Sequence, residues 1–433
     1  MKFKPYPVYK DSGVEWLGRV PEHWRVERGM SAFTESRRVN YDLQSNEYLS
    51  LVAGRGVLPY AEKGNIGNKK PDDLSKCKLV DAGDYVINSM NFMIGSYGVS
   101  PYDGVCSPVY VVLKNKEDVL KIGYGDLIFS DPSYQQYTQS FGTGILDHRR
   151  AIGWDEIKQI PIPLPPLQEQ CAISFFVHAE TTRIDVLIAK KARFIELLRE
   201  KRQALITHAV TKGLDADAPM KDSGVEWLGE VPRAWAVAKL NYRFDIQLGK
   251  MLDEKKIVGT NAVRYLRNKD VQWSGINAED LPTMDIKPQE LERYTVIRGD
   301  LLVCEGGEVG RAAIWMGERI GYQKALHRVR SRSGDEPEFL RYVLMAASAS
   351  GAFEEQDTKS TISHLPAEKF RTYKFPFPPS VEQRAITIYL DRATARIDTL
   401  IAKTERSIEL LRERRTALIS AAVTGKIDLR EAA

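Results

Sequence analysis

The run "RIDVLIAKKARFIELLREKRQALITHAVT" at Arg183–Thr211 returns as "RIDTLIAKTERSIELLRERRTALISAAVT" at Arg396–Thr424. The two runs align without gaps, and most of their positions are identical. In both, apolar residues recur at spacings of three and four, while Lys, Arg and Glu fill the other positions. This spacing is typical of an amphipathic helix. The sequence therefore predicts two long helices that are copies of one another.

The segments on either side set the limits of both helices. "PLPPLQEQCAI" (Pro163–Ile173) and "PFPPSVEQRAI" (Pro376–Ile386) precede them, and such prolines prevent a helix from beginning earlier. Gly213 and Gly425 lie near the far ends, where helices commonly stop. Each helix then has about 40 residues and a length of roughly 60 Å.

A narrow apolar stripe on so long a helix favours a partner helix. The obvious partner is the other copy, paired antiparallel about a pseudo-twofold axis. The alternative is that each helix packs only on its own domain. The residues expected in the stripe are Ile184, Leu187, Leu198, Leu205, Ile397, Leu400, Leu411 and Leu418.

The duplication extends beyond the helices. "KDSGVEWLG" occurs at Lys10–Gly18 and at Lys221–Gly229, followed by "VPEHWRV" and "VPRAWAV". The chain is therefore a tandem repeat with a period much longer than that of a solenoid. We expect this segment to anchor each repeat near a helix end, either its own or that of the other repeat; ordinary packing at a domain start is the alternative. The tryptophans expected in this role are Trp16, Trp24, Trp227 and Trp235.

The two middle regions, 25–160 and 236–375, share almost no sequence. Both contain short β-rich runs between Gly- and Asn-rich turns. The predicted fold class is α+β: a tandem pseudo-twofold repeat of two mixed α/β domains separated by two long antiparallel coiled-coil helices. The predicted boundaries are 1–165 for the first domain, 166–219 for a central helical spacer, 220–379 for the second domain and 380–433 for a C-terminal helical spacer.

Composition excludes several classes of protein. Hydrophobic residues make up 43% and charged residues 28%, as in ordinary globular proteins. No run is apolar enough for a membrane span, and the first residues lack a signal core. The four cysteines form no CxxC pair, which argues for a reducing compartment and against a zinc site. The prediction is a cytoplasmic protein without membrane contact.

Motifs for catalysis are weak. "SDPSY" (Ser130–Tyr134) and "SFGTG" (Ser140–Gly144) are similar to amino-methyltransferase motifs, but too few residues separate them to build a cofactor-binding βα unit. We expect a turn-rich surface loop there instead. "CEGGEVGR" (Cys304–Arg311) lacks the ending of a phosphate loop, and no HExxH occurs. No catalytic residue, metal ligand or cofactor is predicted in this chain.

Basic and amide side chains gather in several polar runs of both middle regions. Arg, Lys, Asn and Gln can contact base edges, and Ser, Thr and Lys can hold phosphates. Each run taken alone also fits a solvated surface, but two such heads on a spacer favour nucleic acid. The candidate DNA-binding residues are Arg37, Arg38, Lys69, Lys70, Asn91, Gln135, Thr143, Arg149, Arg264, Arg267, Asn268, Lys269, Arg311, Gln323, Lys324, Arg328, Lys359, Ser360, Thr361 and His364.

The duplicated start, the two proline hinges and the two helices together resemble the specificity subunit of type I restriction-modification systems. "GTGILDHRR" (Gly142–Arg150) and "STISHLPAEKF" (Ser360–Phe370) also precede the hinges as such loops do in that family. The resemblance covers essentially the whole chain.

The resemblance implies that each middle region is a target recognition domain that reads one half of a split double-stranded DNA sequence. It implies that the helices set the spacing of the halves and dock two modification subunits, which bind S-adenosylmethionine and methylate adenine. Two restriction subunits would add ATP- and Mg-dependent translocation and cleavage, as a defence against phage. The rival hypotheses are a self-contained DNA adenine methyltransferase and a coiled-coil adaptor that binds only proteins.

Overall fold

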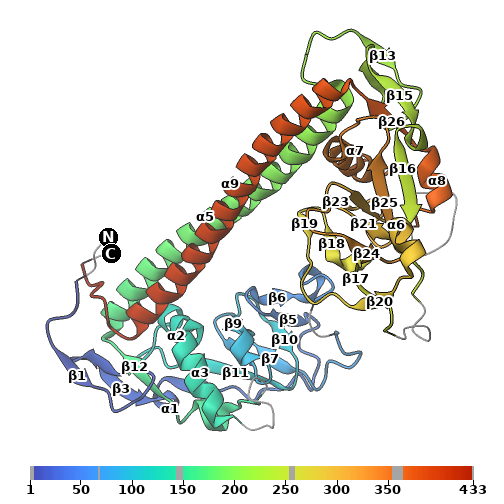
Figure 1. The fold of residues 1–433 in the computed structure, drawn as a ribbon. Helices are drawn as coiled ribbons and strands as arrows, with labels where there is room; N and C mark the ends of the chain where they lie inside the picture. The colour runs from blue at the N-terminus through green and yellow to red at the C-terminus, as the bar shows by residue number, and fades with distance from the viewer. Residues whose placement is uncertain (1–3, 67–68, 143–149, 253–258, 354–363, 432–433) are drawn as a thin grey trace. The chain divides into compact units, whose positions relative to one another are not determined.

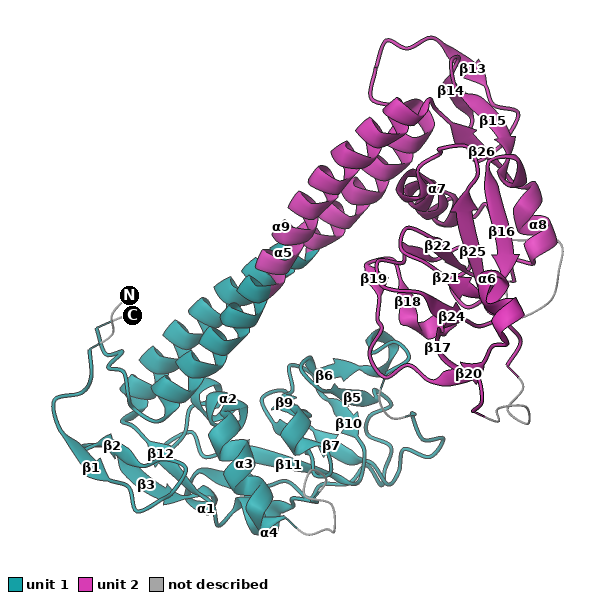
Figure 2. Ribbon diagram, viewed as in Figure 1, with its two compact units in different colours: residues 1–192, 406–433 teal, residues 193–405 magenta. Residues whose placement is uncertain are grey.

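A computed structural model describes residues 4–66, 69–142, 150–252, 259–353 and 364–431. The chain forms two compact units, residues 1–192 with 406–433 and residues 193–405 (Figure 2). Two long helices, α5 (Leu167–Lys212) and α9 (Ser380–Val423), are labelled in Figure 1. The boundary between the units falls inside both of them (Figure 2). Each unit therefore contains one mixed α/β head together with parts of both helices.

The long helices begin and end close to where the sequence predicts. Helix α5 has 46 residues and α9 has 44, so both are slightly longer than expected. Gly213 and Gly425 follow their last turns with φ values of +80° and +69°. Glycine adopts this left-handed conformation without strain, which ends each helix.

The two helices pack against each other within each unit, in antiparallel directions. In the second unit, Arg199 pairs with Glu405 at 3.2 Å and Arg202 with Asp398 at 2.9 Å. Residue numbers therefore fall along α9 as they rise along α5, as in antiparallel helices. The residues that face inward recur at alternating spacings of three and four, as in a coiled coil. These buried or half-buried positions are Thr181, Ile184, Ile188, Lys191, Ile195, Leu198, Arg202 and Leu205 on α5, and Thr394, Ile397, Ile401, Thr404, Ile408, Leu411, Arg415 and Leu418 on α9.

Two residues of the predicted stripe lie outside this seam. The side chains of Leu187 and Leu400 are 40% and 45% exposed. A heptad seam takes only two positions in every seven, so an apolar residue next to it remains on the surface. The prediction that these two leucines pack between the helices was wrong.

The first head is built on an antiparallel sheet of order β4-β11-β8-β9. A strand from the proline hinge, β12, pairs with β3, and β1 pairs with β2. The strands are β1 (Tyr9–Asp11), β2 (Arg19–Pro21), β3 (Arg25–Arg28), β4 (Phe33–Glu35), β5 (Leu49–Val52), β6 (Gly56–Pro59), β7 (Lys78–Val80), β8 (Tyr85–Asn88), β9 (Tyr97–Val99), β10 (Gly104–Cys106), β11 (Tyr110–Asn115) and β12 (Pro161–Leu164). The helices are α1 (Gly29–Ala32), α2 (Ile122–Ser130), α3 (Pro132–Phe141) and α4 (Trp154–Ile157).

The second head repeats this topology. Its main sheet has the order β16-β25-β22-β23, the hinge strand β26 pairs with β15, and β13 pairs with β14. A second sheet, β20-β17-β24-β21, contains one parallel pair. The strands are β13 (Met220–Asp222), β14 (Glu230–Pro232), β15 (Ala236–Lys239), β16 (Phe244–Leu248), β17 (Ala262–Leu266), β18 (Val271–Gln272), β19 (Gly275–Ile276), β20 (Thr283–Asp285), β21 (Thr295–Val296), β22 (Leu301–Cys304), β23 (Ala312–Ile314), β24 (Ile320–Tyr322), β25 (Leu326–Ser331) and β26 (Lys374–Phe377). The helices are α6 (Leu291–Tyr294), α7 (Pro337–Ala349) and α8 (Ala367–Thr372).

The heads also share a Gly–Asp turn before the central strand. Gly83 and Gly299 have φ values of +97° and +93°. The buried carboxylates of Asp84 and Asp300 then accept hydrogen bonds from backbone N–H groups three residues earlier, at 2.9 and 2.8 Å. The two middle regions therefore have one fold despite their different sequences. The predicted fold class, two mixed α/β halves with two long antiparallel helices, is confirmed.

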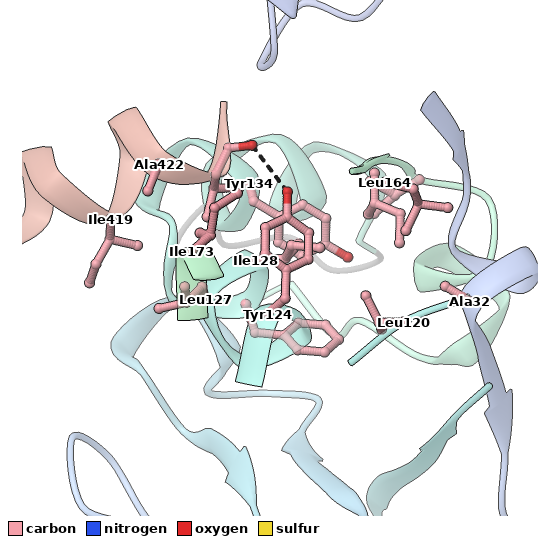
Figure 3. Close-up of a cluster of buried hydrophobic side chains, with 14 of the residues drawn as sticks. Ala32, Leu120, Tyr124, Leu127, Ile128, Tyr134, Leu164, Ile173, Ile419 and Ala422 are labelled. Carbon is pink, nitrogen blue, oxygen red and sulfur yellow. Dashed lines mark hydrogen bonds between the residues drawn. The ribbon is translucent and has the colours of Figure 1, made fainter. Parts of the chain in front are cut away.

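The core of the first unit joins the head to both helices. Figure 3 shows side chains of α2, of the hinge strand, of α5 and of α9 converging on one apolar cluster. Tyr124 and Ile173 are fully buried there, and Ala422 closes the cluster from α9. The core of the second unit combines α7, β26 and parts of both long helices in the same way.

Candidate nucleic-acid interface

Each head is fastened to the helices by a tryptophan and a glutamate from the repeated motifs. In the first unit, the indole N–H of Trp24 donates to Glu169 Oε1 at 2.9 Å. In the second, Trp235 donates to Glu382 Oε1 at 3.0 Å. Both glutamates lie in the first turn of a long helix. Because the tryptophans are almost completely buried, these hydrogen bonds form in a largely desolvated environment.

The same tryptophans contact the end of the long helix that belongs to the other repeat. A Cβ added at Gly425, which follows α9, would lie 3.1 Å from the Trp24 ring and 2.3 Å from Pro21. A Cβ at Gly213, which follows α5, would lie 3.2 Å from the Trp235 ring. The tryptophan at the start of each repeat therefore contacts the first turn of the long helix of its own repeat. It also contacts the end of the long helix of the other repeat.

The remaining two tryptophans lie on the hinge strands instead. Trp16 donates its indole N–H to the Pro161 carbonyl at 3.2 Å. Trp227 packs edge-on against Phe375 with ring centroids 6.2 Å apart. Trp16 also packs edge-on against Tyr134 in the first turn of α3, with ring centroids 5.3 Å apart.

A glutamine in each proline hinge binds the start of one head helix, α2 in the first head and α7 in the second. Gln170 donates to the Pro165 carbonyl at 2.9 Å and accepts from the Lys121 N–H at 2.8 Å. Gln383 donates to the Pro378 carbonyl at 2.8 Å and accepts from the Glu336 N–H at 2.9 Å. Lys121 and Glu336 are the N-cap residues of α2 and α7. Sequence reasoning did not assign these glutamines a role, although the repeated Glu–Gln pair was the available signal.

In the second head, several candidate residues surround the loop that follows β22. Asn268 donates to the Gly306 carbonyl at 3.0 Å and accepts from Arg311 at 3.0 Å. Arg267 makes two hydrogen bonds of 2.9 Å to the Asp270 carboxylate. These polar groups already have protein partners, so they hold the shape of the loop.

The segment that carries His364 closes on the same loop. Gly306 and His364 form an antiparallel bridge, and the Leu365 N–H donates to the Glu305 carbonyl at 2.7 Å. The Glu305 N–H in turn donates to Ala325 at 3.0 Å, next to the exposed Lys324. The fold thus brings Asn268, Lys324 and His364 to one end of the central sheet.

The first head has the same connection. The Ile152 N–H donates to the Ser89 carbonyl at 3.1 Å, so the segment returning to the hinge is again tied to the loop after the central strand. The exposed Asn91 lies in this loop. No described contact links it to Arg37 or Arg38, which pair with Glu35 and Asp81. Arg38 and Lys114 hold the pKa of the Asp81 carboxyl below its ordinary value.

Two of the predicted DNA contacts are buried. The side chain of Arg328 is 7% exposed, and it bonds to Asp245 at 2.9 Å and to the Glu292 carbonyl at 2.8 Å. Gln135 is 9% exposed and donates to the Phe129 carbonyl at 2.7 Å. Neither side chain can reach a base, because the surrounding strands and helices cover it. Both assignments are therefore corrected to structural roles.

The other candidates are accessible or lie outside the described residues. The side chains of Lys69 and Lys70 are exposed, as is that of Lys269, while Gln323 is half-buried. Arg264 is exposed and donates to the Ala278 carbonyl at 3.0 Å. The candidates outside the described residues are Thr143, Arg149, Lys359, Ser360 and Thr361.

The methyltransferase-like stretch forms the start of a helix. Asp131 caps α3 by accepting hydrogen bonds from the N–H groups of Ser133 and Tyr134 at 2.7 and 3.2 Å. Asp131 and Tyr134 are fully buried, so the expected surface loop was wrong. A buried capping carboxylate stabilises the helix and is not available to a substrate amine.

Within the described residues, no group of three His, Cys, Asp or Glu side chains could hold a metal ion. Among the described helices, none is both long enough and apolar enough to cross a membrane.

The fold and its loops define a class of protein: two heads of one topology and different surfaces, carried on a duplicated helix pair. Residues 232–410 match the family described as the type I restriction modification DNA specificity domain. The resemblance to type I restriction-modification specificity subunits that the sequence indicated is thereby confirmed, and it is extended by relatives along nearly the whole chain.

Two curated relatives illustrate this extent. The type I restriction enzyme MjaVIII specificity subunit of Methanocaldococcus jannaschii is 25% identical over 94% of this chain and 94% of its own length. The EcoKI specificity subunit of Escherichia coli is 22% identical over 95% of this chain and 90% of its own.

Solved structures share the fold. A chain from a study of complex assembly and conformational transition of the type I R-M system aligns with a TM-score of 0.74 at 17% identity, over 94% of this chain and 99% of that one. The HsdS subunit of Thermoanaerobacter tengcongensis aligns with a TM-score of 0.61 at 18% identity, over 94% and 98%.

Proposed function

We propose that this chain is the non-catalytic DNA-recognition subunit of a type I restriction-modification complex, with each head reading one half of a bipartite duplex target. The observation that carries the proposal is the contrast between scaffold and heads. The helices and hinges share most of their residues between the repeats, and the heads keep one topology while their loops differ. Two different readers on one repeated scaffold suit a target made of two different half-sites.

Exposed loops and turns of each head supply groups suited to DNA. In the second head, Lys269, Lys324 and His364 are exposed. In the first, Asn91 and the Lys69–Lys70 pair are exposed. Asn can pair with adenine in the major groove, and Lys can contact guanine or phosphate. The partner subunit would act on an unstacked adenine, so the heads need only position the duplex.

Exposed apolar residues at matching positions of the two helices support docking of two copies of one partner. Leu187 and Leu400 form one such matching pair, and Leu197 and Leu410, 46% and 49% exposed, form another. Phe175 and Ile388 are 69% and 52% exposed. The support lies in the repetition of these exposed residues at equivalent positions of both helices, since exposed apolar surface is common at protein interfaces. We assign these faces to two modification subunits that bind S-adenosylmethionine.

Two restriction subunits, with ATP and Mg, would complete the assembly. The proposed function places the chain in the cytoplasm, where it meets DNA.

The test is to express the chain with its modification subunit in a host without DNA methylation and to map N6-methyladenine. Two short sequence blocks separated by a fixed gap are expected, and replacing residues 236–375 should change one block only. Methylation by the chain alone would favour a self-contained methyltransferase. A stable complex without salt-dependent duplex binding would favour a protein-only adaptor.

A further inference from the structure

In the second head, the turn that joins β24 to β25 carries the exposed Lys324, and its main chain is bonded to the segment that follows β16. The Lys250 N–H donates to the Tyr322 carbonyl at 3.0 Å, and the Lys324 N–H donates to the Lys250 carbonyl at 2.9 Å. A Cβ added at Gly249 would lie 2.2 Å from the Gln323 carbonyl oxygen. The two segments are therefore in direct backbone contact on this side of the turn.

The opposite side of the turn is bonded to the loop that follows β22. The Ala325 carbonyl accepts from the Glu305 N–H at 3.0 Å and from the Asn268 side-chain amide at 3.3 Å. The same amide donates to the Gly306 carbonyl at 3.0 Å, and its oxygen accepts from Arg311 Nη2 at 3.0 Å. One asparagine thus connects the turn to the neighbouring loop, and the backbone that carries Lys324 is fixed from both sides.

The matching turn of the first head has a different chemical character. Pro108, two residues before β11, stands where Lys324 stands two residues before β25, because both strands pair in the same register with the central strand of their sheet. The next residue, Val109, is 63% exposed. An ammonium group and an apolar turn recognise different base edges, so this position can distinguish the two heads.

A fixed backbone is what separates a base contact from a phosphate contact. A phosphate contact positions the duplex and carries no sequence information, whereas a base contact needs a donor held at one place against one base edge. Guanine presents two acceptors, O6 and N7, in the major groove, and lysine is one of the side chains that donate to them.

We propose that Lys324 is a specificity-determining residue of the second head that donates to the O6 and N7 acceptors of a guanine in the major groove, with Asn268 as the residue that positions its turn. This proposal rests on the proposed function as a DNA-recognition subunit. It adds the class of base that one half of the target must contain.

The test uses the complex of the full chain with its modification subunit, acting on duplexes that carry the sequence block assigned to residues 236–375. Each guanine of the block is replaced in turn by 7-deazaguanine, which lacks the N7 acceptor but keeps its base pairing. At one guanine, the native complex should lose about tenfold in methylation rate. Lys324→Met should lose a similar factor on the unmodified duplex and should not respond to the replacement.

Two further variants provide the controls. Lys324→Arg should keep the response to 7-deazaguanine, because arginine also donates to guanine O6 and N7. Lys374→Met, which changes an exposed lysine of the hinge strand β26 in the same head, should respond as the native complex does.

Three results would overturn the proposal while the proposed function stands. They are a block without a G·C pair, an equal tolerance of Lys324→Met for every base pair, and a loss of modification-subunit binding without a change in base preference. If no split motif is found at all, the proposed function fails and this proposal fails with it.

The positioning role of Asn268 has its own readout. Asn268→Ala should relax the preference at the guanine that Lys324 reads, since the turn loses its side-chain donor. Adding Lys324→Met should not reduce discrimination at that guanine further, because both changes act on one contact. Additive losses, or a change of preference at another base pair, would refute this role.

Discussion

The helices and the heads of this chain have diverged to different degrees. The helices keep most residues in common over 183–211 and 396–424, whereas the heads share only a topology, a Gly–Asp turn and the attachment to the hinge. Each helix must pack against its own copy, so a change in one seam position disturbs a contact with the other repeat. A head loop need not match the other repeat, so its sequence can change more freely. The difference separates residues that hold the scaffold from those that could carry specificity.

The largest expected effect comes from the anchor that both repeats share. Trp24→Ala should lower the free energy of unfolding of the first unit by about 3–5 kcal/mol, because it opens a cavity and leaves the Glu169 carboxylate without its indole donor. Urea unfolding followed by hydrogen exchange in α9 measures this effect. Trp235→Ala should cost the second unit a similar amount, and a loss below about 1 kcal/mol in either would show that the anchors are not equivalent.

The next expected effect is a pH dependence of stability that differs between the two heads. His327 is fully buried, its Nε2 lies 2.8 Å from the Leu365 carbonyl, and burial lowers its pKa to about 4. In the unfolded chain the pKa of the His327 imidazole has its ordinary value of 6.5, so acid favours the unfolded state. The free energy of unfolding therefore has its full value above pH 6.5 and decreases as the pH falls toward 4, by about 3 kcal/mol in total.

The first head carries Val111 at the matching strand position. His327→Val should therefore remove this part of the pH dependence in the second head. The measurement is the pH dependence of exchange protection in β25 between pH 6.5 and 4. An unchanged slope in the variant would assign the acid sensitivity to other groups.

A smaller effect tests the hinge glutamines. Gln170→Ala leaves the Lys121 N–H without its acceptor and should cost about 1–3 kcal/mol, seen as faster exchange at the start of α2. Gln383→Ala should act in the same way on α7. An effect in only one unit would mean that the hinges, unlike the anchors, have diverged.

The smallest expected effect on stability comes from a substitution on the exposed surface of a long helix, compared with one in the seam between the helices. Leu187→Ala should change the free energy of unfolding by less than about 0.5 kcal/mol, since the side chain is largely exposed. It should nevertheless weaken binding of the modification subunit, measured by calorimetry. Ile184→Ala, a seam change one turn away, is the control and should cost about 2–5 kcal/mol. Unaltered partner binding by Leu187→Ala would remove this face from the docking surface.

Much of the scaffold could be predicted because its signals are local and repeated. Helix periodicity, hinge prolines and terminal glycines each act over a few residues, so α5 and α9 appear in the sequence at close to their observed limits. The candidate site was harder to predict. Arg328 and Lys324 belong to the same basic run, but one is covered by Asp245 and neighbouring strands and the other is exposed.

The sequence by itself determined the duplication, the order of heads and helices, and the family resemblance, because identity between repeats does not depend on three-dimensional contacts. Only the tertiary structure decided which basic residues are exposed and which leucines lie outside the seam. It also placed Gln170 and Gln383 at the starts of α2 and α7. Burial and register arise from segments far apart in the chain, so no local pattern encodes them.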